Sequence, residues 1–357
     1  MADLVVAGAG MAGLVVAAEA RARGADVVVH EKLDRPGGSM RLSSGVVWRY
    51  REFERFRREC PGGDPALQRT LHDRLDEDIE WLRALGAPVI ADGTGNPLTT
   101  GARLNPAALT EALLAAAGGA IRLRHPLAAL PDGAPVVLAT GGFAASRELV
   151  RTHVTAEADH LFLRAAPGAS GDGLRLGLDA GGEATAGLGE IYGRNMPAPP
   201  ARIGAGDLVD LAQLYARHAI VTNSDGERHA ARTWSEIDVV QWTARQPRAR
   251  AWFEVPRERL AERVSDRTVG EMVEAAARAG APVRRGPRSV TVETVAGITS
   301  TLGGLRIRPS GRVASGVWAA GGDVGGIATG GYVSGLAAAL VFGRLAAAAA
   351  LAEGAAD

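Results

Sequence analysis

The feature that most constrains this chain is a glycine pattern close to its start. Gly8, Gly10 and Gly13 have the spacing G-x-G-x-x-G between an apolar run at 4–7 and helix-forming residues at 11–23. That order predicts a buried parallel strand followed by a helix. The first glycine permits a tight turn, the second lets the backbone approach a pyrophosphate, and the third lets helix and strand pack closely. The pattern therefore predicts a βαβ dinucleotide-binding segment.

A carboxylate follows where a dinucleotide ribose needs one. Residues 26–30 form a second strand-like run, and Glu31 comes 18 residues after Gly13. A carboxylate at that place can accept hydrogen bonds from both ribose hydroxyls, while the helix N-terminus offers free N–H groups to the phosphates. This context makes a purely structural glycine turn a poor alternative.

A second signal lies near the other end of the chain. Residues 317–323, VWAAGGD, predict a buried strand that ends in an exposed carboxylate, that of Asp323. Such a carboxylate can hydrogen-bond the ribityl hydroxyls of a flavin, which NAD lacks. The long helix expected from Gly335 would direct its positive end at the flavin ring. The two signals together predict FAD.

Composition excludes several other classes. Lys and Arg number 40, as do Asp and Glu, which argues against electrostatic binding to nucleic acid or to an anionic membrane. The apolar run at 335–351 is rich in alanine and broken by Arg344, so we predict a buried helix rather than a membrane span. The start lacks the basic region of a signal peptide. We expect a cytoplasmic protein with a small-molecule substrate.

No metal site or hydrolytic motif is expected. Cys60 is the only cysteine, which excludes an intramolecular disulfide, and we expect an inert thiol. The histidines are dispersed without the spacing of metal ligands. Neither a G-x-S-x-G elbow nor a P-loop occurs.

Periodicity and capping residues predict further elements. The expected elements are helices over 65–85 and 106–117, a strand over 136–139, a helix over 174–180 capped by Asp172, and a helix opened by the capping box Thr268 and Glu271.

The chain resembles the flavoproteins that include fumarate reductase, succinate dehydrogenase and 3-ketosteroid dehydrogenase. The resemblance extends over nearly the whole length. It depends on GAGMAG (8–13), Glu31-Lys32, PGGSMRLSSG (36–45), ATGGF (139–143), SGDG (170–173), NSDGER (223–228), TLGGLRI (301–307), AAGGDVGG (319–326) and GLAAALVFGRLA (335–346).

This resemblance implies an α/β fold in two domains. A Rossmann-like FAD-binding domain would comprise residues 1–183 and 297–357, and a smaller α+β cap domain, residues 184–296, would be inserted into it. The residues expected to bind FAD are Gly8, Gly10, Met11, Ala12, Gly13, Glu31, Lys32, Gly38, Ser39, Met40, Ser44, Gly45, Leu127, Ala139, Thr140, Gly141, Asp172, Asp323, Gly335 and Leu336. Succinate dehydrogenases bond FAD covalently through a histidine in the second glycine-rich segment. No histidine occurs between His30 and His72, so we expect non-covalent FAD.

The residues that bind a dicarboxylate in fumarate-type members are replaced. Their two histidine positions correspond to Tyr192 and the pair at 299–300, the acid arginine to Glu236, and the last arginine to the vicinity of Gly330. Two substrate carboxylates without these cations would cost several kcal/mol to bury. We therefore do not expect fumarate reduction.

Four residues are candidates for the chemistry. Tyr192 and Arg194 would lie on one face of an extended segment, where the guanidinium favours a phenolate and so eases proton transfer. Tyr332 precedes the last helix, where ketosteroid enzymes also have a tyrosine. For both tyrosines the alternative is aromatic packing. Glu236 is a weaker candidate, with a surface helix position as its alternative.

We thus expect an FAD-dependent dehydrogenase or ene-reductase acting on a C–C bond next to a carbonyl. The electron acceptor is left open. One alternative is a flavin-dependent amine or amino-acid oxidase, and a second is a non-catalytic flavin-binding protein.

Overall fold

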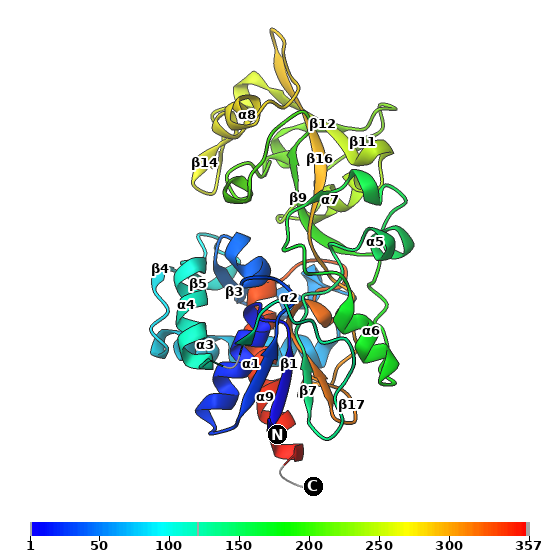
Figure 1. Cartoon of the computed structure of the whole chain (residues 1–357). Helices are drawn as coiled ribbons and strands as arrows, with labels where there is room; N and C mark the ends of the chain where they lie inside the picture. The colour runs from blue at the N-terminus through cyan, green and yellow to red at the C-terminus, as the bar shows by residue number, and fades with distance from the viewer. Residues whose placement is uncertain (1, 120, 355–357) are drawn as a thin grey trace. The chain divides into compact units, whose positions relative to one another are not determined.

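The computed structural model describes residues 2–119 and 121–354, which form two compact units (Figure 1). The first unit comprises Met1–Ser146, Ala165–Glu190 and Ser300–Asp357, and the second comprises Arg147–Arg164 and Ile191–Thr299. The first unit is therefore assembled from both ends of the chain.

A mostly parallel sheet forms the centre of the first unit. Its strands, in spatial order and among the residues described, are β17 (Arg312–Ala314), β18 (Val317–Ala319), β7 (Val136–Leu138), β1 (Leu4–Ala7), β2 (Val27–His30) and β6 (Ile121–Arg122). Only β17 pairs antiparallel with its neighbour. The apolar residues of β1, β7 and β18 are buried, as expected of strands covered on both faces.

Two helices from opposite ends of the chain pack together beside this sheet. α1 (Met11–Ala22) contacts α9 (Gly335–Gly354), and Figure 1 shows them next to β1. A Cβ at Gly343 would lie only 3.0 Å from Val15 Cγ1, so glycine permits the close helix approach. α4 (Pro106–Ala117) packs on α1, and α6 (Asp172–Asp179) packs on β7 and β18.

A smaller sheet and two helices complete the first unit. β3 (Val46–Tyr50), β5 (Thr99–Leu104) and β4 (Val89–Asp92) pair antiparallel in that order, and α2 (Phe53–Glu59) leads into α3 (Pro65–Ala84). Asp64 caps α3 by accepting hydrogen bonds from two backbone N–H groups. The periodic apolar residues of α3 are buried, as predicted: Leu67, Leu71, Leu75, Ile79 and Leu82.

The second unit is built on a separate, largely antiparallel sheet. The long strand β16 (Ser289–Thr301) is its centre. The other strands are β11 (Arg228–His229), β10 (Ile220–Thr222), β12 (Arg250–Pro256), β15 (Val283–Arg285), β8 (Phe162–Leu163) and β9 (Ile191–Pro197).

Helices pack beside this second sheet. α7 (Ile237–Thr243) packs on β9, and α8 (Val269–Arg278) begins with the predicted capping box of Thr268 and Glu271. The core here includes Tyr215, Phe253 and Val292.

The boundaries of the two units differ from the predicted domains in three places, residues 147–164, 184–190 and 297–299, and the last of these belongs to the second unit. Residues 147–164, expected in the FAD-binding domain, belong to the second unit, because β8 pairs with β16 and Thr155 Oγ1 donates to the Ala244 carbonyl at 2.9 Å. Residues 184–190, expected in the cap, belong to the first unit. These boundaries depend on strand pairing between segments far apart in the chain, which local sequence patterns do not predict.

The predicted elements are present, with one correction. α6 begins at Asp172 itself, and Gly171 occupies the cap position with a φ of +90°. Asp172 is therefore not the helix cap. A left-handed residue at the cap favours glycine, and the Asp172 side chain is directed to Lys32 instead.

One helix in the part of the chain described, α9, is long and apolar enough to cross a membrane by length and composition alone. However, 56% of its most apolar window is buried within the protein. Its burial agrees with the predicted buried helix.

Candidate functional site

The glycine turn between β1 and α1 has the predicted division of roles. Gly8 has a φ of +100°, and a Cβ there would lie 2.3 Å from the Ala139 carbonyl oxygen. A Cβ at Gly13 would lie 1.8 Å from the Gly8 carbonyl oxygen, so these two glycines serve close packing. At Gly10, by contrast, no protein atom lies within 4 Å of the Cβ position. An open space therefore adjoins the N-terminus of α1, as a pyrophosphate requires.

The second glycine-rich segment lies against this turn. A Cβ at Gly38 would lie 3.2 Å from Gly10 Cα, and Gly37 N–H donates to the Ala9 carbonyl. Ser39 Oγ accepts from the Ala166 N–H at 2.9 Å. The structure thus brings together two segments that the sequence assigned to the same cofactor.

Several other predicted FAD residues of the first unit are buried or half-buried. Met11, Ala12, Met40 and Ala139 are buried, whereas Ser44, Leu127 and Leu336 are half-buried. Gly45, with a φ of +72°, packs against the Leu104 carbonyl, where a Cβ would lie 1.9 Å away. Its close packing is by itself a structural reason for glycine.

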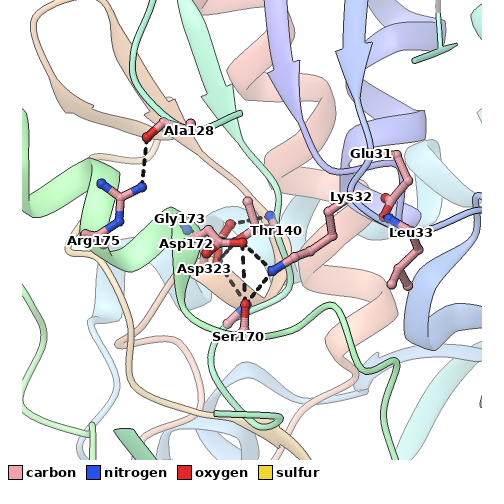
Figure 2. Close-up of polar contacts among 11 residues, drawn as sticks. Glu31, Lys32, Leu33, Ala128, Thr140, Ser170, Asp172, Gly173, Arg175 and Asp323 are labelled. Atoms are coloured by element: carbon pink, nitrogen blue, oxygen red, sulfur yellow. Dashed lines mark hydrogen bonds and ion pairs between the residues drawn. The ribbon is translucent and has the colours of Figure 1, made fainter. Parts of the chain in front are cut away.

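The Glu31 carboxylate is fixed beside the glycine turn. Its two oxygens accept hydrogen bonds from the N–H groups of Ala9 at 2.7 Å and Leu33 at 2.8 Å. Figure 2 shows the Glu31 carboxylate directed back toward Leu33. Each carboxylate oxygen has a further lone pair, so ribose hydroxyls can still be accepted.

Lys32 links the end of β2 to the start of α6. Its ammonium pairs with the Asp172 carboxylate at 2.5 Å and also donates to Ser170 Oγ (Figure 2). Lys32 is the only lysine of the chain. Ser170 was not predicted as a site residue, although it lies in the SGDG segment used for the resemblance.

Asp323 is placed differently from the prediction. Its side chain is buried at 1% exposure rather than exposed, and it accepts from Thr140 N–H, Thr140 Oγ1 and Gly142 N–H. Burial raises the pKa of this carboxyl, and the three donors oppose that shift. Asp323 thus holds Thr140, in the turn after β7, as Figure 2 shows.

The N-terminus of α9 is a second open position. Ser334 Oγ accepts from the Ala337 N–H at 3.2 Å, while Gly335 is exposed and has no protein atom within 4 Å of its Cβ position. Open spaces at two helix N-termini, with no acidic side chain in the first turn of either, suit an anionic group and an electron-accepting ring. The residues of the first unit therefore fit FAD.

In the second unit, Tyr192 and Arg194 share one face of β9, as predicted. The Arg194 guanidinium carbon lies 5.1 Å from the centre of the Tyr192 ring, within cation–π range. Arg194 also donates to the carbonyl oxygen of Ser235. The guanidinium is therefore held between the phenol ring and the residue before Glu236.

Glu236 is not a surface residue on a helix. It precedes α7 with a φ of +55°, a left-handed conformation that is rare for a residue with a long side chain, and it is only 6% exposed. Its Oε1 accepts from the Arg217 N–H at 3.2 Å. Burial raises the pKa of this carboxyl despite the nearby charges of Arg194 and Arg217. The interpretation as a solvated carboxylate is thus wrong.

Arg217 is a residue that the sequence analysis missed. Its guanidinium Nε lies 3.7 Å from Glu236 Oε1, and its Nη2 donates to the Trp234 carbonyl. The two charged residues are 19 positions apart without a motif. The contact between Arg217 and Glu236 could therefore not be predicted from the sequence.

Tyr332 belongs to the first unit and lies in an aromatic cluster. Its carbonyl accepts from Tyr50 Oη at 2.9 Å, and the Trp48 ring lies 5.6 Å away, edge-on. This environment agrees with the packing alternative as well as with a site role. The structure groups Tyr192, Arg194 and Glu236 in one unit and Tyr332 in the other.

Within the described ranges, no group of three or more His, Cys, Asp or Glu side chains is arranged to hold a metal ion. Cys60 is fully buried, and burial raises the pKa of its thiol to about 12. The thiolate needed for redox chemistry is therefore disfavoured.

Comparison with known proteins identifies the family. The family model described as "FAD binding domain" matches residues 3–132 and 127–335. The chain belongs to this FAD-binding family, and its cofactor is FAD.

Relatives agree with this assignment. The chain is 26% identical over 284 residues to fumarate reductase (cytochrome) of Shewanella frigidimarina, covering 63% of this chain and 47% of that protein. It spans about half the length of the curated relatives it matches.

Solved structures share the fold. A flavocytochrome c3 fumarate reductase in an open conformation superposes with a TM-score of 0.74 at 19% identity, over 99% of this chain and 78% of that one. The 3-ketosteroid-Δ4-(5α)-dehydrogenase of Rhodococcus jostii RHA1 gives 0.73 at 20% identity, over 98% and 96%. The predicted α/β flavoprotein fold is confirmed. These relatives give no support to the amine oxidase alternative.

Proposed function

We propose that this chain is an FAD-dependent oxidoreductase that removes or adds hydrogen across a C–C bond next to a carbonyl. The relatives named above are a fumarate reductase and a 3-ketosteroid dehydrogenase, and both names describe changes at such a bond. When bound, FAD supplies the hydride acceptor or donor. The protein must then supply the site for the proton.

The observation that carries the proposal is the group formed by Tyr192, Arg194 and Glu236. A phenol, a guanidinium and a carboxyl are grouped in one unit, with Arg194 5.1 Å from the Tyr192 ring and bonded to the carbonyl before Glu236. These are side chains that transfer or orient protons. Glu236 also has a left-handed conformation, and backbone strain of this kind concentrates at functional sites.

Each of these residues has a proposed role. Tyr192 exchanges a proton with the substrate or orients its carbonyl, and Arg194 stabilises negative charge on the phenol oxygen. Glu236, whose pKa is raised by burial, can hold a proton closer to neutral pH. Tyr332 is proposed as a further candidate, a tyrosine that precedes α9 in the same unit as the FAD residues.

The substrate that fits these residues is small and carries at most one negative charge. By the resemblance, Glu236 stands where fumarate-type members have an arginine, and in this chain it is a buried carboxyl. At this position a second substrate carboxylate would meet a carboxyl in place of a cation, and its desolvation would cost several kcal/mol. We therefore propose a neutral or monoanionic carbonyl compound.

We further propose that FAD is bound without a covalent link, since no histidine lies between His30 and His72. When the protein is denatured and removed by ultrafiltration, all of the flavin should pass into the filtrate.

A cytoplasmic location without membrane or nucleic-acid partners is proposed from the equal numbers of acidic and basic residues and the buried α9. The electron acceptor is left unassigned.

Anaerobic mixing with a panel of saturated and unsaturated carbonyl compounds tests the proposal. We expect bleaching of the oxidised flavin by a saturated ketone, or reoxidation of the reduced flavin by an enone, and little reaction with fumarate or succinate. Tyr192→Phe should slow that reaction by about 10²–10⁴-fold, because general acid–base groups contribute that much.

Tyr215→Phe is a control for the loss of a tyrosine hydroxyl in the same unit. Tyr215 is fully buried, and its hydroxyl donates to the Gln213 side chain. This variant should leave the reaction rate within a few-fold of wild type. A flavin that reacts with no member of the panel would instead favour a non-catalytic flavin-binding protein. An unchanged rate in Tyr192→Phe would remove the proton-transfer role.

A further inference from the structure

Gln68, on α3, is a buried polar side chain that no part of the proposed chemistry uses. It is fully buried at 0% exposure. Its amide nitrogen donates to the carbonyl oxygens of Cys60 and Ile327, both at 2.9 Å, and its amide oxygen accepts from Arg57 at 2.5 Å. Only this orientation of the amide satisfies all three partners, since two carbonyl oxygens need a donor.

The residues just before Gln68 bind the same part of the chain. Asp64 N–H donates to the Gly326 carbonyl at 2.7 Å, and Gly62 N–H donates to the Thr329 carbonyl at 3.1 Å. Residues 62–68 thus bind three of the four carbonyls from 326 to 329. We call this set of three hydrogen bonds the α3 clamp.

The far half of the same turn is also fixed within the first unit. Gly330 N–H donates to Glu190 at 2.7 Å, Tyr50 Oη donates to the Tyr332 carbonyl at 2.9 Å, and Ser334 Oγ donates to the Val46 carbonyl at 3.0 Å. The turn ends directly at the open N-terminus of α9. Its position therefore sets where Tyr332 and the first turn of α9 lie.

We propose that Gln68 is a positioning residue that sets the place of the turn 326–334 and so of the α9 N-terminus relative to the flavin ring. The inference rests on the proposed function, because it takes the flavin ring to lie at that helix end. Gln68 is the only side chain of the α3 clamp, whose other two bonds come from the backbone. It is therefore the one point of the α3 clamp where a side-chain substitution can remove a bond to the turn without changing the backbone.

The physical consequence follows from the helix dipole. When FAD is bound with its ring at this helix end, the positive end of α9 would stabilise negative charge on the reduced ring. Loosening the turn moves or disorders that end, so the reduced form loses stabilisation. The midpoint potential of the bound flavin should then fall.

Gln68→Met tests this, because methionine keeps the length of the side chain but cannot donate to the Ile327 carbonyl. We expect about a tenfold smaller ratio of reduced to oxidised flavin at a fixed potential, which corresponds to about 30 mV for two electrons. Gln68→Glu is the second variant. It keeps an oxygen for Arg57 but loses both donors, so it should lower the potential in the same direction.

Asp64→Ala is the matched control for stability. It removes the side-chain cap of α3 from the N–H groups of Ala66 and Leu67 but keeps the backbone bond to Gly326. Loss of such a cap destabilises a helix. Asp64→Ala should thus lower the melting temperature while leaving the flavin potential at its wild-type value.

The potentials are measured by reductive titration of the FAD-loaded full chain without any substrate. A lower potential in both Gln68 variants and an unchanged one in Asp64→Ala supports the positioning role. Wild-type potentials in both Gln68 variants, or an equal fall in Asp64→Ala, would overturn it. Absence of a reacting substrate in the carbonyl panel would contradict the proposed function alone, because this readout needs none.

Discussion

Glu236 is the residue at which folding and proposed function conflict most directly. It is buried, it has a φ of +55°, and burial raises its pKa. A left-handed conformation in such a residue costs of order 1–3 kcal/mol. Costs of this kind concentrate at sites that act on substrates, which favours a role in the proposed proton transfer.

Glu236→Gln should separate stability from activity. Because the folded pKa lies above the ordinary glutamate value, the carboxyl contributes stability below that value and loses it as pH rises through the folded pKa. Glutamine carries no charge at any pH, so the variant should be more stable than wild type at pH 8, on the order of 1 kcal/mol. This gain in stability should disappear as the pH is lowered toward 4. The variant should also reduce its flavin more slowly than wild type.

Thermal unfolding of wild type and Glu236→Gln between pH 4 and pH 8 measures the sign of their difference in stability. Glu157→Gln offers a control, because Glu157 is a half-buried glutamate of the same unit. A Glu236→Gln variant that is less stable at pH 8 than at pH 4, relative to wild type, would contradict the account.

Sequence motifs predicted local turns better than they predicted the burial of individual side chains. The spacing of Gly8, Gly10 and Gly13 determines their roles locally, so it was readable from the sequence. Burial of Asp323 and Glu236 was not, because it depends on donors 181–183 and 19 residues away. A carboxylate at the end of a motif looks the same in sequence whether it faces a ligand or its own backbone.

At the scale of elements, α9 is held by a buried ion network. Arg344 Nε donates to Glu19 of α1 at 2.9 Å, and its Nη1 pairs with Asp78 of α3, which is fully buried. Burial raises the pKa of Asp78, and the Arg344 charge opposes that shift. The network therefore joins the last helix to two helices from the first quarter of the chain.

Arg344→Met should destabilise the protein by about 3–5 kcal/mol at pH 7, because it leaves two buried carboxylates without this cation. The loss should shrink as pH falls and Asp78 is protonated. Urea unfolding measures both. Arg306→Met is the control, since its partner Glu183 lies 3.2 Å away on the surface and such a pair contributes little. Equal losses in the two variants would contradict a structural role for the network.

Most elements were predictable because periodicity and caps act over a few residues. The helices over 65–85 and 106–117 and the capping box of α8 appear as expected. The cap of α6 was not, since Asp172 is directed to Lys32, 140 residues away. A competing partner of that kind has no signature in the local sequence.

For the whole molecule, the central feature is an FAD-binding fold assembled from both ends of the chain. β1 and β18 each pair with β7, so strands from the two ends flank the same middle strand. The order of motifs along the sequence predicted this arrangement. The boundaries of the second unit were less predictable, because β8 joins its sheet from a distant part of the chain.

Titration of the purified chain and its Gly10→Val variant with FAD tests the central claim most directly. No protein atom lies within 4 Å of the Cβ position at Gly10, so valine there should leave the fold and the melting temperature of the FAD-free protein unchanged. Wild type should become yellow with one FAD per chain and melt at a higher temperature. The variant should bind FAD at least about 100-fold more weakly, since valine fills the pyrophosphate position. A wild-type chain that stays colourless in excess FAD, or a variant that binds FAD equally well, would contradict the account.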